Sequence, residues 1–130
     1  MIRLSAWVVT LSDGSTATVR PLTVRERIAT TEAFAGQCAE RASADARLAG
    51  MASAEVFREV TTARRNARTA SALVMDCFTL DGAMRVLHAA SVDAERIAAG
   101  VEPKELSWIA LEALGVDRED ADGRTDAGNA

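Results

Sequence analysis

The amino-acid sequence predicts an α+β fold that is mostly α, with an N-terminal β-hairpin followed by a small bundle of four or five helices. Two observations carry this prediction. Two short runs rich in β-branched residues flank Asp13-Gly14, a dipeptide that favours a hairpin turn. From Thr23 onward the chain is rich in alanine, the strongest helix former, and apolar residues recur at helical spacing.

The 130 residues are expected to form one domain over 1–116, made of a hairpin (1–22) and a helical part (23–116). Residues 117–130 hold five acids and no large apolar side chain. Such a segment cannot bury enough apolar surface to offset the conformational entropy that it would lose on folding. We therefore expect a disordered acidic C-terminal tail.

Several residues predict where the second strand of the hairpin ends and where the first helix begins. Pro21 ends the second strand, because proline has no N–H to donate to a strand ladder. Thr23 and Glu26 have the spacing of a capping box, in which each side chain accepts from the other residue's backbone N–H. We expect the first helix over Val24–Arg41 and a connecting element over Ser43–Gly50.

The longest helix is expected over Ala54–Phe78, with an apolar face and an arginine-rich back. Asp81 then caps a short helix, and another short helix runs towards Gly100. The last helix begins at Pro103, a residue suited to the first turn, and ends at Gly115 as its C-cap.

Composition narrows the function classes. The net charge of −4 is unevenly distributed: residues 1–70 hold 10 arginines and seven acids, and residues 71–130 hold five basic residues and 12 acids. This argues against a general nucleic-acid binder. No apolar run reaches about 18 residues, so no membrane partner is expected. Cys38 and Cys77 lie on apolar faces, which favours buried thiols in a reducing compartment.

No pattern in the sequence supports catalysis. His88 is the single histidine and has no cysteine within a helical turn, so a zinc site is disfavoured. The glycines match no phosphate-binding loop. The acidic pair Glu102 and Glu105 lies at a helix start, where it complements the helix dipole. We predict no catalytic residue, no metal and no cofactor. We therefore expect that the protein is not an enzyme.

Large apolar side chains are the remaining candidates for function. The partner-binding candidates are Trp108, Ile109, Leu111 and Leu114 on the last helix, together with Trp7 on the hairpin. The alternative is that most of these residues complete a small core. Trp108 is the first choice for an exposed anchor, since aromatic residues dominate interface energetics.

One stretch also suggests a family. Leu11–Gly14 and Thr18–Glu26 give a strand, a DG turn, a second strand ending in V-R-x-L-T, and a charged helix. This arrangement resembles the N-terminus of the tail assembly chaperones of tailed phages, prophages and gene transfer agents. The resemblance implies a non-catalytic helper that binds the tape-measure protein and helps recruit tail-tube subunits. It also implies a location in the host bacterial cytoplasm and absence from the mature virion.

Two other function classes stay open. One is a structural virion protein, such as a head-to-tail connector or a tail component. The other is a small DNA-binding regulator. A homo-oligomer and a longer frameshifted form also stay open.

Overall fold

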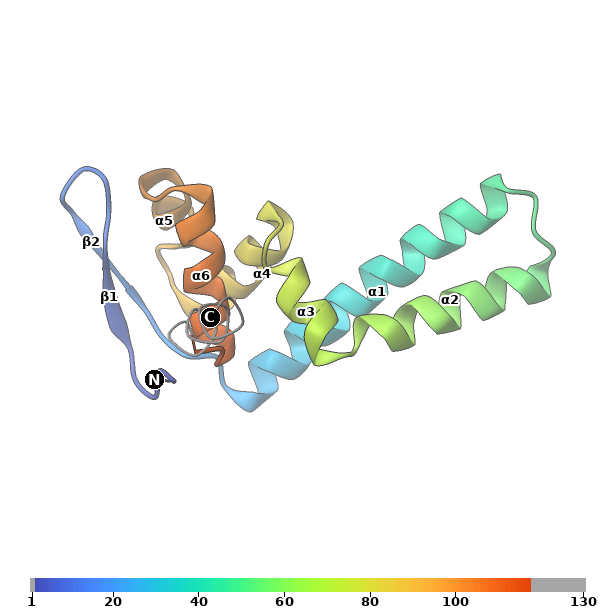
Figure 1. Cartoon of the computed structure of the whole chain (residues 1–130), viewed down its shortest axis with the longest axis horizontal. Coiled ribbons are helices and arrows are strands. Elements are labelled where there is room, and N and C mark those ends of the chain that lie inside the picture. The colour runs from blue at the N-terminus through green and yellow to red at the C-terminus, as the bar shows by residue number, and fades with distance from the viewer. Residues whose placement is uncertain (1, 118–130) are drawn as a thin grey trace, which may run out of the picture. The chain divides into compact units, whose positions relative to one another are not determined.

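The computed structural model describes residues 2–117, and the chain divides into two compact units (Figure 1). The first unit combines the segment up to Arg27 with the segment from Asp76 onward. The second unit is Ile28–Met75. The single domain expected over 1–116 stays a prediction, and each unit is described by itself. The expected tail lies outside the described residues, apart from Asp117.

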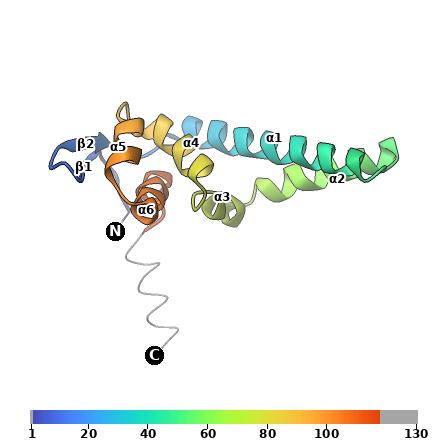
Figure 2. The ribbon, with the colours of Figure 1, turned by 90° about the horizontal axis from the view of Figure 1, so that it is seen from above.

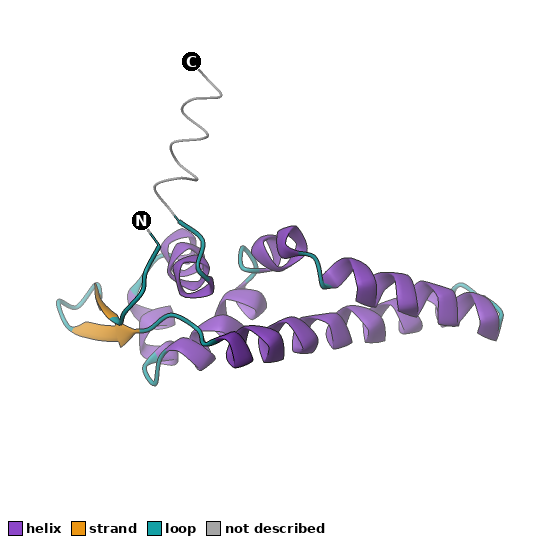
Figure 3. Cartoon of the chain, turned by 90° about the horizontal axis from the view of Figure 1, so that it is seen from below, coloured by secondary structure: helices purple, strands orange, loops and turns teal. Residues whose placement is uncertain are grey.

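The predicted fold class is confirmed: a two-stranded antiparallel hairpin precedes the helices, and the only strands of residues 2–117 are in that hairpin (Figure 3). The described part of the chain has six helices, one more than the upper number expected. The elements in order are β1 (Trp7–Thr10), β2 (Thr16–Val19), α1 (Val24–Leu48), α2 (Ser53–Ala67), α3 (Ala70–Asp76), α4 (Leu80–Ala90), α5 (Ala94–Gly100) and α6 (Pro103–Leu114).

The hairpin has one buried and one exposed face. Its register pairs Trp7 with Val19 and Val8 with Thr18. Ala17 and Val19 of β2 are buried, whereas Val8 of β1 is 62% exposed. The alternation follows from the two-residue period of a strand, and it directs the inner face of β2 into the core of the first unit.

The hairpin turn is longer than the tight two-residue turn that Asp13-Gly14 suggested. The connection runs over Leu11–Ser15, with Gly14 at a φ of 85°. Leu11 turns inward and is buried against Gly100, where an added Cβ would lie 2.8 Å from the Leu11 Cβ. The Ser12 N–H also donates to the Gly100 carbonyl over 2.8 Å. Burial of Leu11 therefore accounts for the wider turn.

The predicted capping box is present at the start of α1. The Thr23 N–H donates to Glu26 Oε1 over 2.9 Å, and the Glu26 N–H donates to Thr23 Oγ1 over 3.1 Å. The Arg20 guanidinium adds two hydrogen bonds to the Glu26 carboxylate, each of 2.6 Å. These donors, Arg20 first, lower the pKa of Glu26 to about 2. The strand end and the helix start are thus joined by one carboxylate.

The core of the first unit lies between the hairpin and helices α4, α5 and α6. Its largest fully buried side chains are Val19, Cys77, Val86, Leu87, Ile97, Ile109 and Leu111. Two backbone hydrogen bonds connect the chain after β2 to this helical part: Arg20 N–H to the Ala90 carbonyl and Leu22 N–H to the Ala113 carbonyl, each 2.9 Å. The marginal hairpin is therefore stabilised by helix packing.

The start of α4 differs from the expected cap at Asp81. Thr79 is the N-cap, and its Oγ1 accepts from the Gly82 N–H over 3.0 Å. The Thr79 N–H and hydroxyl both donate to the Asp76 carbonyl, which makes a close turn between α3 and α4. Thr79 can act as the N-cap of α4 because the preceding helix ends at Asp76 and does not continue to Phe78, its expected end.

The second unit contains a helical hairpin in which α1 and α2 lie side by side (Figures 1 and 2). The connection expected over Ser43–Gly50 is wrong, because α1 continues to Leu48. Alanine-rich sequence continues the helix at low cost, and Ala46 is buried on its inner side. The turn then passes through Gly50, whose φ of 75° suits glycine.

The single helix expected over Ala54–Phe78 is also wrong, because it is divided into α2 and α3. The break lies at Arg68 and Thr69, and it explains the additional helix. Thr69 Oγ1 accepts from the Ala72 N–H over 3.2 Å, which is the contact of an N-cap. A threonine that can cap therefore restarts the helix in a different direction. Ser53, the expected cap of α2, is its first residue.

The core of the second unit is thin. Its buried residues are Thr30, Ala35, Ala39, Ala46 and Ala67, none with a large side chain. Ile28, a large apolar residue of this unit on α1, is 59% exposed. Four buried alanines bring little apolar area out of water, so this unit has a weak hydrophobic core of its own.

Candidate protein-binding surfaces

Three of the predicted partner-binding residues on α6 are core residues. Ile109, Leu111 and Leu114 are 2%, 1% and 8% exposed. The helix is apolar on more than one face because it packs against both α4 and α5 in the first unit. In the described chain these three side chains are therefore not available to a partner.

Trp108 is the one residue of that set on α6 that is only half-buried. Its indole ring meets the Phe78 ring edge to face, with 6.1 Å between the centroids and an interplanar angle of 86°. Phe78 is 50% exposed, and Leu80, two residues further on, is 66% exposed. We call Phe78 and Trp108 the aromatic pair. This pair presents apolar area to solvent at the start of α4. The Phe78 ring is supported there by Trp108 of α6.

Trp7 has a different environment. It is half-buried on the inner side of β1, and the Arg3 guanidinium lies 4.9 Å from its ring centroid. Arg3 is held in turn by Glu112 of α6, with Nε 2.9 Å from Oε2. The cation therefore covers Trp7, while the ring contact of Trp108 is with Phe78.

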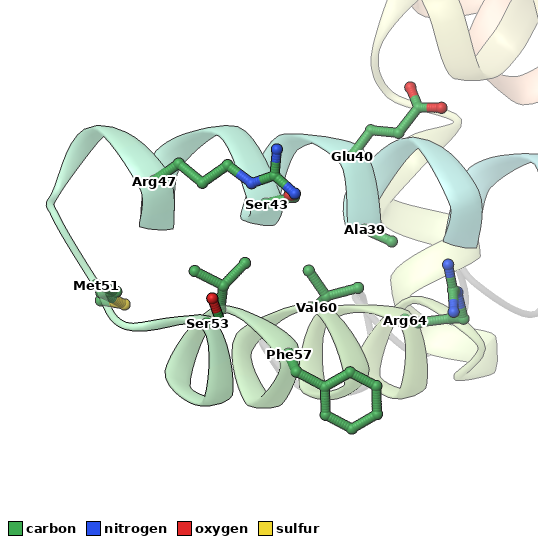
Figure 4. A pocket seen from close by; sticks show the side chains of 10 residues that line it. Ala39, Glu40, Ser43, Arg47, Met51, Ser53, Phe57, Val60 and Arg64 are labelled. Atoms are coloured by element: carbon green, nitrogen blue, oxygen red, sulfur yellow. The ribbon is translucent and has the colours of Figure 1, made fainter.

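The second unit has a groove between α1 and α2 (Figure 4), with a volume of about 530 Å³. Val60 points from α2 towards α1, whereas the Phe57 ring points away from α1 and is 71% exposed. Small residues such as Ala39 and Ser43 line the α1 wall. The groove exists because the small alanine and serine side chains of α1 do not fill the space between the two helices.

Charged residues lie along the edges of this groove. Glu40 and Arg47 come from α1, and Arg64 comes from α2. Figure 4 shows Glu40 and Arg64 towards the same end of the groove and Arg47 near the other end. Glu40 and Arg64 form no ion pair with another residue of the described chain. The groove therefore combines apolar side chains with charges at its edge, and one of these charges also acts inside the chain: Arg68 first, and Arg64 with it, lower the pKa of the Glu32 carboxyl.

Sequence reasoning found only part of these surfaces. The apolar face expected on the helix over Ala54–Phe78 is directed towards α1 at Val60 (Figure 4), but Phe57 was not singled out from the sequence. Phe57 directly follows Val56, and a step of about 100° turns it to the side of the inner face. A large aromatic residue at the edge of an apolar stripe was the available signal.

The described residues contain no group of three or more histidine, cysteine, aspartate or glutamate side chains that could hold a metal ion. Cys77 is fully buried, and burial, followed by the charge of Asp76, raises the pKa of its thiol to about 12. A thiol in this environment is not a reactive nucleophile. His88 is exposed and lies 3.2 Å from the exposed Glu95.

No family model, no curated protein and no solved structure matches the chain. Among residues 2–117, no helix is both long enough and apolar enough to cross a membrane.

The arginine-rich back of α2 bears on the alternative of a DNA-binding regulator. Arg68 donates two hydrogen bonds to Glu32 of α1, of 3.0 and 2.9 Å. The Arg68 guanidinium, which would have to contact a phosphate, is therefore already bound to the Glu32 carboxylate. Arg58 and Arg65 are exposed, but Glu55 and Glu59 lie on the same helix. This mixture of charges does not favour phosphate binding.

Proposed function

We propose that the chain is a non-catalytic assembly chaperone for phage tail morphogenesis, which binds the tape-measure protein and helps recruit tail-tube subunits. The resemblance of Leu11–Gly14 and Thr18–Glu26 to tail assembly chaperones motivates this proposal. The observation that carries it is the aromatic pair, in which a half-exposed Phe78 rests on Trp108.

The aromatic pair suits an apolar client for a physical reason. The protein has only five aromatic residues, and burying Phe78 fully in its own core would stabilise it by about 1–2 kcal/mol more. An exposed aromatic ring held in place by a second ring is a preorganised anchor, since little side-chain entropy is lost when a partner covers it. An amphipathic helix can cover such an anchor with its apolar face.

The proposed function can be tested in the genome and with the expressed protein. The genome that encodes the chain should also encode a very long helical protein and a tail-tube protein close by. When the chain is co-expressed with that long protein, the long protein should stay in the supernatant and co-purify with the chain. An operon of metabolic or regulatory genes, or a long protein whose solubility does not respond to the chain, would refute the proposal.

A matched pair of variants tests the aromatic pair itself. Phe78→Ser removes the exposed ring, and we expect co-purification of the long protein to fall about tenfold or more, as for an interface hot spot. Val92→Ser removes an apolar side chain that is fully exposed in the same unit, and we expect no change. Helical circular dichroism checks that both variants are folded. Equal binding by both would exclude Phe78 as the anchor.

A further inference from the structure

The groove of the second unit has complementary charges on its two walls. Glu40 lies on the α1 wall and Arg64 lies on the α2 wall, towards the same end (Figure 4). A second, identical hairpin can lie over the groove with its α2 above α1 and its α1 above α2. In that arrangement each Glu40 lies at the same end of the groove, and on the same side, as the Arg64 of the other copy, so a two-fold axis allows two ion pairs.

The apolar residues fit the same arrangement. Phe57 of one copy then lies over the α1 wall of the other, where Ala39 and Ser43 leave room for an aromatic ring. Each helix becomes adjacent to antiparallel neighbours only, as in an up-down four-helix bundle. The second copy also supplies the apolar cover that the small buried alanines of this unit do not provide.

We infer that the groove between α1 and α2 binds a second copy of this chain, and that the two helical hairpins form a four-helix bundle. This inference is independent of the proposed function, because it concerns a different unit and a different surface. The charges commit it to one occupant: a copy of the chain supplies an arginine where the groove has a glutamate and a glutamate where it has an arginine.

The expected affinity follows from the size of the surface. The 15-residue helix α2 is about 22 Å long, and two adjacent helices are about 20 Å wide. The covered area is therefore about 450 Å² per copy, or about 900 Å² in total, which is at the low end for specific interfaces. We expect a dimer with a dissociation constant in the micromolar range, of about 1–100 μM.

The test is sedimentation equilibrium of the full chain over a series of concentrations that spans this range. The wild-type chain should change from monomer to dimer. Glu40→Arg and Arg64→Glu should each weaken the dimer about tenfold or more, because each single change places like charges opposite each other twice. The double variant with both changes should restore the dimer, since every pair is again attractive.

Two further variants complete the design. Phe57→Ala should also weaken the dimer about tenfold, without loss of helical circular dichroism, because its ring is 71% exposed in the single chain. Arg58→Glu is the charge control, since Arg58 does not line the groove, and it should leave the dimer unchanged. A chain that stays monomeric throughout the series, or a double variant as weak as the single variants, would overturn the inference.

Discussion

Substituting Gly82 by alanine should destabilise the first unit, although alanine normally favours a helix. A Cβ at this position would lie 2.6 Å from Asp76 Cγ and closer still to the Asp76 carbonyl oxygen. Asp76 cannot move freely, because its carbonyl accepts from Thr79 and its carboxylate pairs with Arg85. The new methyl group must therefore disrupt the turn between α3 and α4.

The magnitude follows from the contacts that are lost. Asp76 and Arg85 are 11% and 18% exposed at their side chains, and breaking an ion pair this shielded costs about 3–5 kcal/mol. Alanine favours a helix over glycine by about 1 kcal/mol, which offsets part of this loss of stability. The net expectation for Gly82→Ala is a loss of about 2–4 kcal/mol.

Gly36 in α1 provides the matched control, because a Cβ there meets nothing within 4 Å. Gly36→Ala should stabilise its helix by about 1 kcal/mol. Urea unfolding followed by helical circular dichroism measures both variants. If Gly82→Ala is as stable as the wild type, the close turn at Asp76 and the account of the α3–α4 junction are wrong.

Three other predictions concern the first unit. Leu87→Ala should cost about 2–5 kcal/mol in urea unfolding, because Leu87 is fully buried among the helices. Because Arg20 lowers the pKa of Glu26 to about 2, this carboxylate stabilises the fold above its unfolded pKa of about 4.3. That stability should be lost as the pH falls from about 4.3 to about 2, and Glu26→Gln should remove this part of the acid dependence of the thermal midpoint. A thiol reagent at about pH 8 should label Cys77 only as fast as the protein unfolds, since its pKa is about 12; rapid labelling of native protein at Cys77 would contradict its burial.

The sequence predicted the features that depend on a few neighbouring residues. The hairpin at Asp13-Gly14, the capping box at Thr23 and Glu26, and the C-cap at Gly115 are all present, because each is stabilised by local geometry and short-range hydrogen bonds. The boundaries within alanine-rich sequence were not predictable in the same way. Alanine favours a helix but gives little apolar contrast, so the continuation of α1 to Leu48 carried no periodic signal.

The surfaces were harder to predict than the elements. Ile109 and Leu111 belong to the core because α6 is packed on two sides, and no property of the helix itself distinguishes that from an exposed apolar face. Trp108 and Trp7 are both half-buried, and the role of Trp108 as a binding anchor stays a prediction. Its neighbour Phe78 was expected at the end of the long helix over Ala54–Phe78. The end of α3 at Asp76 places Phe78 in a turn and exposes it.

The most direct test of the proposed function is quantitative mass spectrometry of purified phage particles and of the lysate from which they come. An assembly chaperone acts before the particle is complete and then leaves it. We predict that the chain is abundant in the lysate, where it co-purifies with the tape-measure protein, and is absent from the mature particle. Finding the chain in purified particles at a fixed ratio to the tail-tube protein would contradict the proposal and identify it as a structural virion protein.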